Sequence, residues 1–335
     1  MSNQSKSINQ SLVSICIPSY NHEKYIAATI DSVILQDYKN IELIIIDDFS
    51  TDNSDIVINS FIDKCKERFV RFEYIKNEKN KGISYNLNKA IKWSQGKHFY
   101  AIASDDILMP FKTSLLVSEI EKLDDSYAAI FGDALFINEL GEKIYIDKNK
   151  TIYTTQTPNS YNTFLKFFGQ YNYLKSINNY FEITYYDIIS DLLFLPAASV
   201  LIKLSAINEV GGYTNGNRVE DFDMWFKLTQ KYKMALIDTP VSLYRLHGQI
   251  SFFGDTKDTS KKLIAMAKDS LATILSQKNF AVLFSKNETY KQLFYSRAKI
   301  AINHIAQFEP IFAKRSADFL SRWIFQKTGE KILFM

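Results

Sequence analysis

Three pairs of acidic residues stand where strands or helices are expected to end or begin. The apolar run Ile41–Ile46 leads into Asp47–Asp48, and the run Phe99–Ala103 ends one residue before Asp105–Asp106. The third pair, Glu220–Asp221, opens a segment of helical periodicity. Carboxylates at the carboxyl ends of buried parallel strands gather along one sheet edge, where open α/β sheets bind ligands. Because like charges in one crevice repel, the pattern predicts a divalent cation that carries a phosphorylated ligand.

Each acidic pair also has a simpler interpretation as a helix cap. Asp47–Asp48 and Asp105–Asp106 precede predicted helices, and Glu220–Asp221 begins one, which are positions that acidic residues often occupy. In the functional interpretation, one carboxylate of Asp105–Asp106 binds Mg²⁺ or Mn²⁺ and its neighbour binds a sugar hydroxyl of a nucleotide-sugar diphosphate. A carboxylate of Glu220–Asp221 would then act as general base on an acceptor hydroxyl. Local sequence leaves both interpretations open.

Two further side chains could contact such a ligand. His247, one of four histidines, could reach a diphosphate or a metal, but a histidine near a turn can equally be structural or exposed. Tyr20 could stack on a base or pack in the core. Ligand patterns of zinc sites, the glycine-rich dinucleotide fingerprint, the phosphate-binding loop and the nucleophile elbow are absent from the sequence.

Composition narrows the class of protein. The chain has 335 residues, 46% of them hydrophobic, and a net charge of +3, which excludes the strongly basic field of a nucleic-acid-binding protein. Two cysteines, Cys16 and Cys65, do not form a disulfide framework and suit a reducing compartment. Met1–Gln10 is polar, and no run approaches the roughly 18 apolar residues of a membrane span. We expect a cytoplasmic protein, with the inner face of the cell membrane as a candidate location.

Strand-like and helix-like patterns alternate from Leu12 to Ile137. Between the predicted strands, apolar residues recur at helical spacing, as in Tyr25–Ile34 and Ser84–Trp93. This alternation predicts an α/β fold with a doubly wound, mostly parallel sheet. The predicted strands are Leu12–Ile17, Ile41–Ile46, Phe69–Ile75, His98–Ala103 and Ala128–Ile137.

The second half of the chain is less regular. Thr151–Asp191 is rich in Tyr, Phe and Asn and has no clear period, which indicates an irregular or partly helical insertion over the sheet edge, or a partner surface. Helical periodicity returns from Ser260 onward. Further predicted elements are strands at Phe194–Ile202, Met234–Ile237 and Val241–Leu246 and a helix at Asp221–Tyr232. We therefore expect a catalytic domain, 1–255, with halves 12–138 and 139–255, and a helical subdomain, 256–335.

Taken together, these segments resemble glycosyltransferase family 2, whose members have the GT-A fold. The resemblance covers Leu12–Ser251 and is carried by an ordered series of motifs, each weak alone. These are Val13–Asn21, Leu43–Asp52, Asn80–Ser84 followed by Asn88, Ser104–Asp106, Gly211–Tyr213 and Glu220–Trp225. The chain departs from the family pattern at Phe49, Asn86 and Ala103, where many members have Gly, Arg and Asp.

The resemblance implies a Rossmann-like GT-A domain with a C-terminal helical extension. It implies inverting transfer of a sugar from a nucleotide-diphosphate donor, UDP-linked, to a hydroxyl of a glycan or lipid-linked acceptor in bacterial surface polysaccharide synthesis. By the same resemblance, Asp106 binds Mn²⁺ or Mg²⁺, Asp221 is the catalytic base, Asp48 contacts the base of the nucleotide and Asp105 the ribose or phosphate. The full set of implied substrate-binding residues is Pro18, Tyr20, Asn21, Asp48, Asn88, Asp105, Glu220 and His247.

Two other classes of protein remain open. A sugar-phosphate nucleotidyltransferase shares such a sheet but needs a glycine-rich basic loop after the first strand, and Pro18–His22 contains no glycine. A non-catalytic nucleotide-sugar-binding protein could use residues 151–191 as its interface. The segment Lys314–Phe325 mixes basic and apolar residues, so it could contact an anionic bilayer or pack on its own domain. A second copy of the chain is a further candidate partner, whereas nucleic acid is not.

Overall fold

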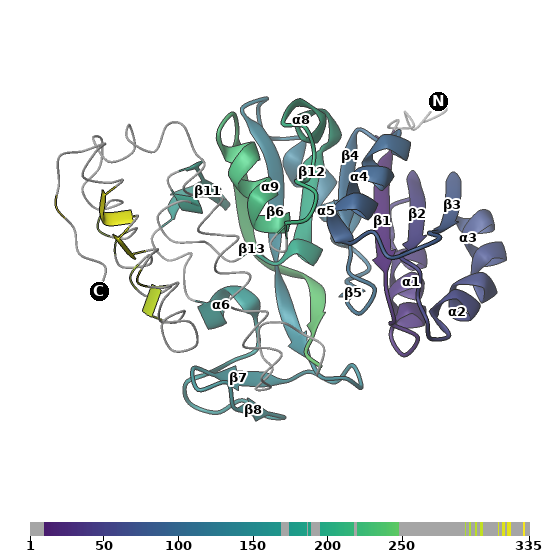
Figure 1. Ribbon diagram of the computed structural model, residues 1–335, viewed down its shortest axis with the longest axis horizontal. Coiled ribbons are helices and arrows are strands. Elements are labelled where there is room, and N and C mark those ends of the chain that lie inside the picture. The colour runs from purple at the N-terminus through teal and green to yellow at the C-terminus, as the bar shows by residue number, and fades with distance from the viewer. Residues whose placement is uncertain are drawn as a thin grey trace, which may run out of the picture.

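The computed structural model describes residues 10–168, 174–185, 187–188, 195–217 and 220–247, with scattered positions between 292 and 331. A ten-stranded sheet crosses the molecule in the order β10-β11-β13-β6-β12-β4-β1-β2-β3, with β5 paired to β13 (Figure 1). Its strands are β1 (Val13–Ser19), β2 (Ile41–Asp47), β3 (Arg71–Lys76), β4 (His98–Ala101), β5 (Ile107–Leu108), β6 (Tyr127–Ile137), β10 (Lys175–Ile177), β11 (Tyr180–Ile183), β12 (Val200–Lys203) and β13 (Lys233–Arg245).

Helices connect and cover these strands. Among the helices that the structure describes, α4 is the longest, and a 3₁₀ turn, η2, precedes β12. The described helical elements are α1 (Ile26–Ile34), α2 (Ser54–Ser60), α3 (Ile62–Arg68), α4 (Ile83–Trp93), α5 (Lys112–Ile120), α6 (Phe164–Phe168), η2 (Ala197–Ser199), α8 (Leu204–Glu209) and α9 (Glu220–Thr229).

The part of the sheet formed by the N-terminal strands β1 to β4 is parallel, as the sequence predicts. β1 pairs in parallel with β2 and β4, and β2 pairs in parallel with β3. All seven residues of β2 are buried, because its apolar run lies in the middle of the sheet with both faces covered. β1 continues through Pro18 to Ser19, beyond the predicted turn. Proline is tolerated there because the β4 ladder ends opposite Cys16, so no bond to β4 is lost.

Beyond β4 the sheet is mixed. β12 runs antiparallel to both β4 and β6, while β13 runs parallel to β6. The prediction of two short strands at Met234–Ile237 and Val241–Leu246 is wrong in one respect, because they form the single strand β13. The ladder shifts register around Pro240, whose missing N–H interrupts regular pairing.

The aromatic insertion is more regular than predicted within its described part. It contributes the hairpin β10–β11, which extends the main sheet beyond β13, and part of a small second sheet, below the main one in Figure 1. That sheet has the order β8-β7-β9 and consists of β7 (Tyr145–Asp147), β8 (Ile152–Tyr153) and β9 (Ser160–Tyr161). Phe164 and Phe167 of this insertion are buried in a second apolar cluster. The cluster consists of Ala134, Phe136, Ile144, Ile146, Phe164, Phe167 and Leu246.

The remaining predictions are only partly covered by the described residues. The strand predicted at Phe194–Ile202 begins at Val200, after η2, and Phe194 itself lies outside the described residues. The helical subdomain 256–335 and the segment Lys314–Phe325 also lie outside them, apart from scattered helical positions such as Ile302 and Leu320, which are buried in the main core. None of the described helices is long and apolar enough to cross a membrane.

Candidate functional site

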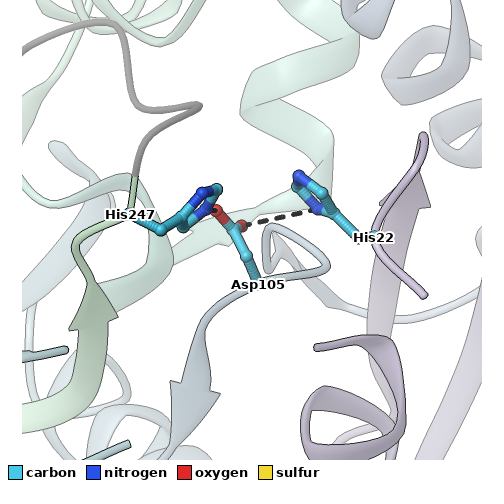
Figure 2. A group of neighbouring side chains, drawn as sticks. All are labelled: His22, Asp105 and His247. Carbon is cyan, nitrogen blue, oxygen red and sulfur yellow. Dashed lines mark hydrogen bonds and ion pairs between the residues drawn. The ribbon is translucent and has the colours of Figure 1, made fainter. Parts of the chain in front are cut away.

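His22, Asp105 and His247 meet from three distant parts of the chain (Figure 2). Each residue offers one ligand atom, and these atoms all lie within 4.8 Å of one another. The Asp105 Oδ2 is 2.8 Å from the His247 Nε2, and its Oδ1 is 4.0 Å from the His22 Nδ1. The His22 Nδ1 also forms a hydrogen bond of 2.7 Å with the Ser104 hydroxyl.

Sheet topology explains why these residues converge. β1, β2 and β4 are mutually parallel, and β12 is antiparallel to both β4 and β6. β6 therefore runs in the direction of β4, and so does β13, which is parallel to β6. The carboxyl ends of β1, β2, β4, β6 and β13 therefore share one edge of the sheet, the usual ligand-binding edge of α/β folds. His22, Asp105 and His247 each follow one of these ends.

The donor set of this cluster suits a divalent transition metal. Imidazole nitrogen together with carboxylate oxygen is a common ligand combination for such ions, whereas Mg²⁺ prefers oxygen donors throughout. The cluster is partly exposed, so a ligand can reach it. The residues present therefore fit a divalent transition-metal ion better than Mg²⁺, and the carboxylate in this cluster is that of Asp105.

Asp106, the predicted metal ligand, faces into the protein. It is buried, and its Oδ1 accepts a hydrogen bond of 2.9 Å from the backbone N–H of Arg245. Burial and then the charge of Asp105 raise the pKa of Asp106 well above its usual value. Lys112, fully buried with its Nζ 3.4 Å from the centroid of the Tyr100 ring, acts in the opposite direction on that pKa. The assignment of a cation to Asp106 stays a prediction, and the geometry favours its neighbour.

Asp48 is held at the start of α4. One carboxylate oxygen accepts hydrogen bonds from the Lys81 N–H at 2.8 Å and the Asn77 amide at 2.9 Å, and the other accepts the Gly82 N–H at 2.8 Å. The neighbouring Asp47 is also buried and binds Ser50, so neither acid of this pair faces solvent freely. Asp48 is thus a rigidly placed acceptor at the ligand edge.

The turn after β1 is tied to the turn after β2. Asn21 has a positive φ of 54°, donates its N–H to the Ser50 hydroxyl at 2.9 Å and accepts the Thr51 N–H at 2.8 Å. Tyr20 is 45% exposed, so core packing does not explain it, and Pro18 lies within β1. The contacts of these residues with substrate stay predictions.

Asn88 joins α4 to the loop that precedes α9. Its Oδ1 accepts the Tyr213 N–H at 2.8 Å, and its amide donates to the Tyr213 carbonyl at 2.8 Å. Gly212 has φ of 71°, and a Cβ there would lie 2.5 Å from the Asn88 Oδ1, so the close approach requires glycine. The structure gives Asn88 a clear architectural role; its predicted substrate contact stays a prediction.

Glu220 and Asp221 lie in the first turn of α9. The Asp221 Oδ1 accepts the Phe222 N–H at 2.7 Å. Both carboxyls retain some exposure but lie deep among protein atoms, and this desolvation raises the pKa of each. The pKa of Glu220 rises to about 8, with the charge of Asp221 as the second cause. A carboxylate with a raised pKa is a better general base than an ordinary one.

The pKa of Tyr244 is affected by acids from two parts of the chain. Desolvation raises its pKa, and the negative charges of Asp106, Asp105 and Asp221 raise it further. The pKa of this phenol is therefore raised both by the acidic motif after β4 and by the acid at the start of α9.

Sequence reasoning gave no role to His22, Arg245 or Tyr244. The available signal for His22 was its place directly after the turn that ends β1, at the predicted ligand edge. Arg245 stands two residues before His247, but nothing in its spacing shows that its side chain turns inward.

Comparison with known proteins gives a consistent result. Residues 14–176 match the model of the family described as Glycosyl transferase family 2. An uncharacterized glycosyltransferase of Rickettsia conorii (strain ATCC VR-613 / Malish 7) is 29% identical over 72% of this chain, which spans only 35% of that relative's length. UDP-Glc:alpha-D-GlcNAc-diphosphoundecaprenol beta-1,3-glucosyltransferase WfgD of Escherichia coli is 36% identical over 38% of this chain and 47% of its own length.

Solved structures share the fold. The mannosyltransferase PcManGT from Pyrobaculum calidifontis, in complex with GDP-Man and Mn²⁺, superposes with a TM-score of 0.56 over 95% of this chain and 81% of its own, at 13% identity. S. aureus TarS 1-349 in complex with UDP-GlcNAc superposes with a TM-score of 0.53 over 88% of this chain and 81% of its own, at 14% identity. These similarities confirm the GT-A fold class.

Proposed function

The chain belongs to glycosyltransferase family 2, and from that premise we propose that it transfers a sugar from a nucleotide-diphosphate donor to an acceptor hydroxyl. The observation that carries this proposal is the cluster of His22, Asp105 and His247, and the acidic pair in the first turn of α9 is a second group of carboxylates. A transfer reaction of this kind needs a place for the diphosphate and a base near the acceptor, and the two groups supply them.

The donor occupies the carboxyl-end edge of the parallel strands in this proposal. Asp48 accepts a hydrogen bond from the base, with Tyr20 and Asn21 beside it on the linked turns after β1 and β2. Asp105, His22 and His247 would hold a divalent cation, for which we propose Mn²⁺ because the structure of PcManGT, which has a similar fold, contains Mn²⁺. When bound there, the cation supplies positive charge that offsets the charge of a diphosphate leaving group.

Asp221 is proposed as the general base. Its carboxylate accepts the proton of the acceptor hydroxyl while the hydroxyl oxygen forms a bond to the anomeric carbon. The bond from that carbon to the nucleoside diphosphate breaks on the opposite face, which inverts the configuration. Glu220, whose pKa is raised to about 8, stays largely protonated near neutral pH and so can donate a hydrogen bond to a sugar oxygen.

A UDP-sugar and a lipid-linked glycan are the substrates we propose. The E. coli relative WfgD is, by its name, a UDP-Glc-dependent enzyme that acts on GlcNAc-diphosphoundecaprenol, and WfaP, which is 38% identical over 38% of this chain, has the same description. Such an acceptor would place the reaction at the inner face of a membrane in surface polysaccharide synthesis.

The test is a transfer assay with purified protein, Mn²⁺ and a panel of UDP- and GDP-sugars. We expect Asp105→Asn and Asp221→Asn each to lower turnover about 100-fold or more, the usual size of losing a metal ligand or a general base. Asp63→Asn, at an exposed position on α3, is the matched control and should keep wild-type turnover.

Other outcomes would contradict the proposal. Release of pyrophosphate from a nucleoside triphosphate would identify a nucleotidyltransferase instead. Tight donor binding without turnover, unaffected by Asp221→Asn, would identify a non-catalytic binding protein.

A further inference from the structure

Arg245 is a buried arginine whose polar contacts bind backbone rather than an acidic side chain. Its Nε donates to the Asp105 carbonyl at 2.7 Å, and its Nη1 donates to the carbonyls of Asn138 at 3.1 Å and Glu139 at 2.9 Å. The guanidinium carbon lies 5.0 Å from the centroid of the Tyr25 ring. A permanently charged group with several fixed donors thus joins three separate segments of the chain.

A second hydrogen bond joins Asp105–Asp106 and Arg245 in the opposite direction. The Asp106 carboxylate accepts the backbone N–H of Arg245 at 2.9 Å, while the Arg245 side chain reaches the carbonyl of Asp105. The Asp106 carbonyl in turn accepts the Thr29 hydroxyl at 2.7 Å, which fixes this loop against α1. These two hydrogen bonds run in opposite directions and join residues separated by 139 and 140 positions in the sequence. Together they leave little freedom for one segment to slide past the other.

The two segments joined in this way carry the carboxylate and one imidazole of the cation cluster. Asp105 is on one side of the paired bonds, and His247 follows Arg245 by two residues on the other. Groups that orient metal ligands commonly change metal affinity when they are removed, although they do not touch the ion.

We infer that Arg245 and Asp106 form a clamp that positions Asp105 and His247 and thereby sets the affinity of the protein for a divalent cation. This inference rests on the proposed function of the cluster. It makes Asp106 an anchor for the end of β13 instead of a cation ligand, and Arg245 a positioning residue. Through the carbonyls of Asn138 and Glu139, the clamp also extends to the turn that leads into the small second sheet.

The clamp depends on arginine and not on positive charge alone. The three carbonyls that it binds come from Asp105 and from the turn at 138–139, and the planar guanidinium offers donors in a fixed fork that spans them. A lysine ammonium is a single point and cannot meet all of them. Arg245→Lys keeps the charge and removes the geometry, which makes it the informative variant.

Arg68 supplies a matched control. Its guanidinium too donates to backbone carbonyls, those of Ile34 at 2.9 Å, Gln36 at 2.8 Å, Tyr38 at 2.7 Å and Lys39 at 3.5 Å, and it lies on α3, away from the cluster. Arg68→Lys should lower the melting temperature without changing cation affinity.

The experiment is calorimetric titration of the full chain with Mn²⁺, without nucleotide, at a temperature where each variant is folded by circular dichroism. We expect Arg245→Lys to weaken Mn²⁺ binding about 10- to 100-fold, the usual effect of removing a group that orients metal ligands. Arg68→Lys should bind as tightly as wild type. An Arg245→Lys variant with wild-type affinity would overturn the inference.

Asp106→Asn is a second test of the clamp, and it can be used even if Arg245→Lys does not fold. The amide oxygen can still accept the Arg245 N–H, so we expect Mn²⁺ affinity to fall by about threefold at most, the effect of one weakened hydrogen bond. A loss of tenfold or more would make Asp106 a ligand and overturn the clamp. If wild type binds no Mn²⁺, or if Asp105→Asn binds as wild type, the proposed cation site fails, and the clamp fails with it.

Discussion

Asp105 and Asp106 are adjacent in sequence, yet their carboxylates meet different surroundings. Asp105 lies among two imidazoles at the exposed edge of the sheet, whereas Asp106 is buried against the backbone of Arg245 and near Lys112. Sequence showed that an acidic pair stands here but could not show which member faces the ligand. That choice depends on where the end of β13 lies, about 140 residues later, which local patterns do not encode.

Glu220 should make stability depend on pH. Its pKa in the folded protein is about 8 against an ordinary value of 4.5, so the folded state keeps a proton that the unfolded state has released. The resulting stabilisation is fully present below pH 4.5 and is lost as pH rises through about 8. We expect the difference in melting temperature between Glu220→Gln and wild type to shift in favour of the variant from pH 6 to pH 9.

The control for this pH effect is Glu78→Gln, at an exposed position. Its melting curve should move in parallel with wild type across the range. Parallel behaviour of Glu220→Gln as well would show that the carboxyl has an ordinary pKa.

At the scale of elements, sequence patterns located most of the parallel half of the sheet. Buried apolar runs and helical spacing predicted the ends of β1, β2 and α4 to within a few residues. Each of these segments has a single dominant hydrophobic period. They failed at β13, where Pro240 separated two apolar runs that tertiary pairing with β6 joins. They also failed in 151–191, where the strands have only two to four residues each and β11 pairs with β13, about 55 positions later.

The link between α4 and the loop before α9 is the testable contact at this scale. Asn88→Ala removes two hydrogen bonds and leaves the backbone of the buried Tyr213 without those partners. We expect a loss of about 1 to 3 kcal/mol in the free energy of unfolding, measured with urea.

Asn59→Ala is the control for this contact, because Asn59 is exposed on α2 and its amide donates to the carbonyl and the carboxylate of Asp55, one turn earlier. Its cost should stay below about 0.5 kcal/mol, as for most surface substitutions. Equal costs for the two variants would mean that Asn88 does not hold the loop.

At the scale of the whole molecule, the site forms where the sheet topology brings the carboxyl ends of several strands to one edge. The described strands that precede Asp48, Asp105 and His247 all point the same way in one sheet, and Asp221 lies in the first turn of α9. The ordered series of motifs was enough to identify the family and the fold class. The identities of the donor sugar, the acceptor and the cation depend on side-chain arrangements that local sequence patterns do not encode.

We propose that Asp105 and His247 hold a cation beside the donor diphosphate. An anomalous-difference map at the manganese absorption edge, from crystals grown with Mn²⁺ and UDP, tests it directly. We predict one strong peak within coordination distance of the Asp105 carboxylate and a His247 ring nitrogen, next to the diphosphate. A peak at the Asp106 carboxylate, or bound UDP with no peak near Asp105, would contradict it.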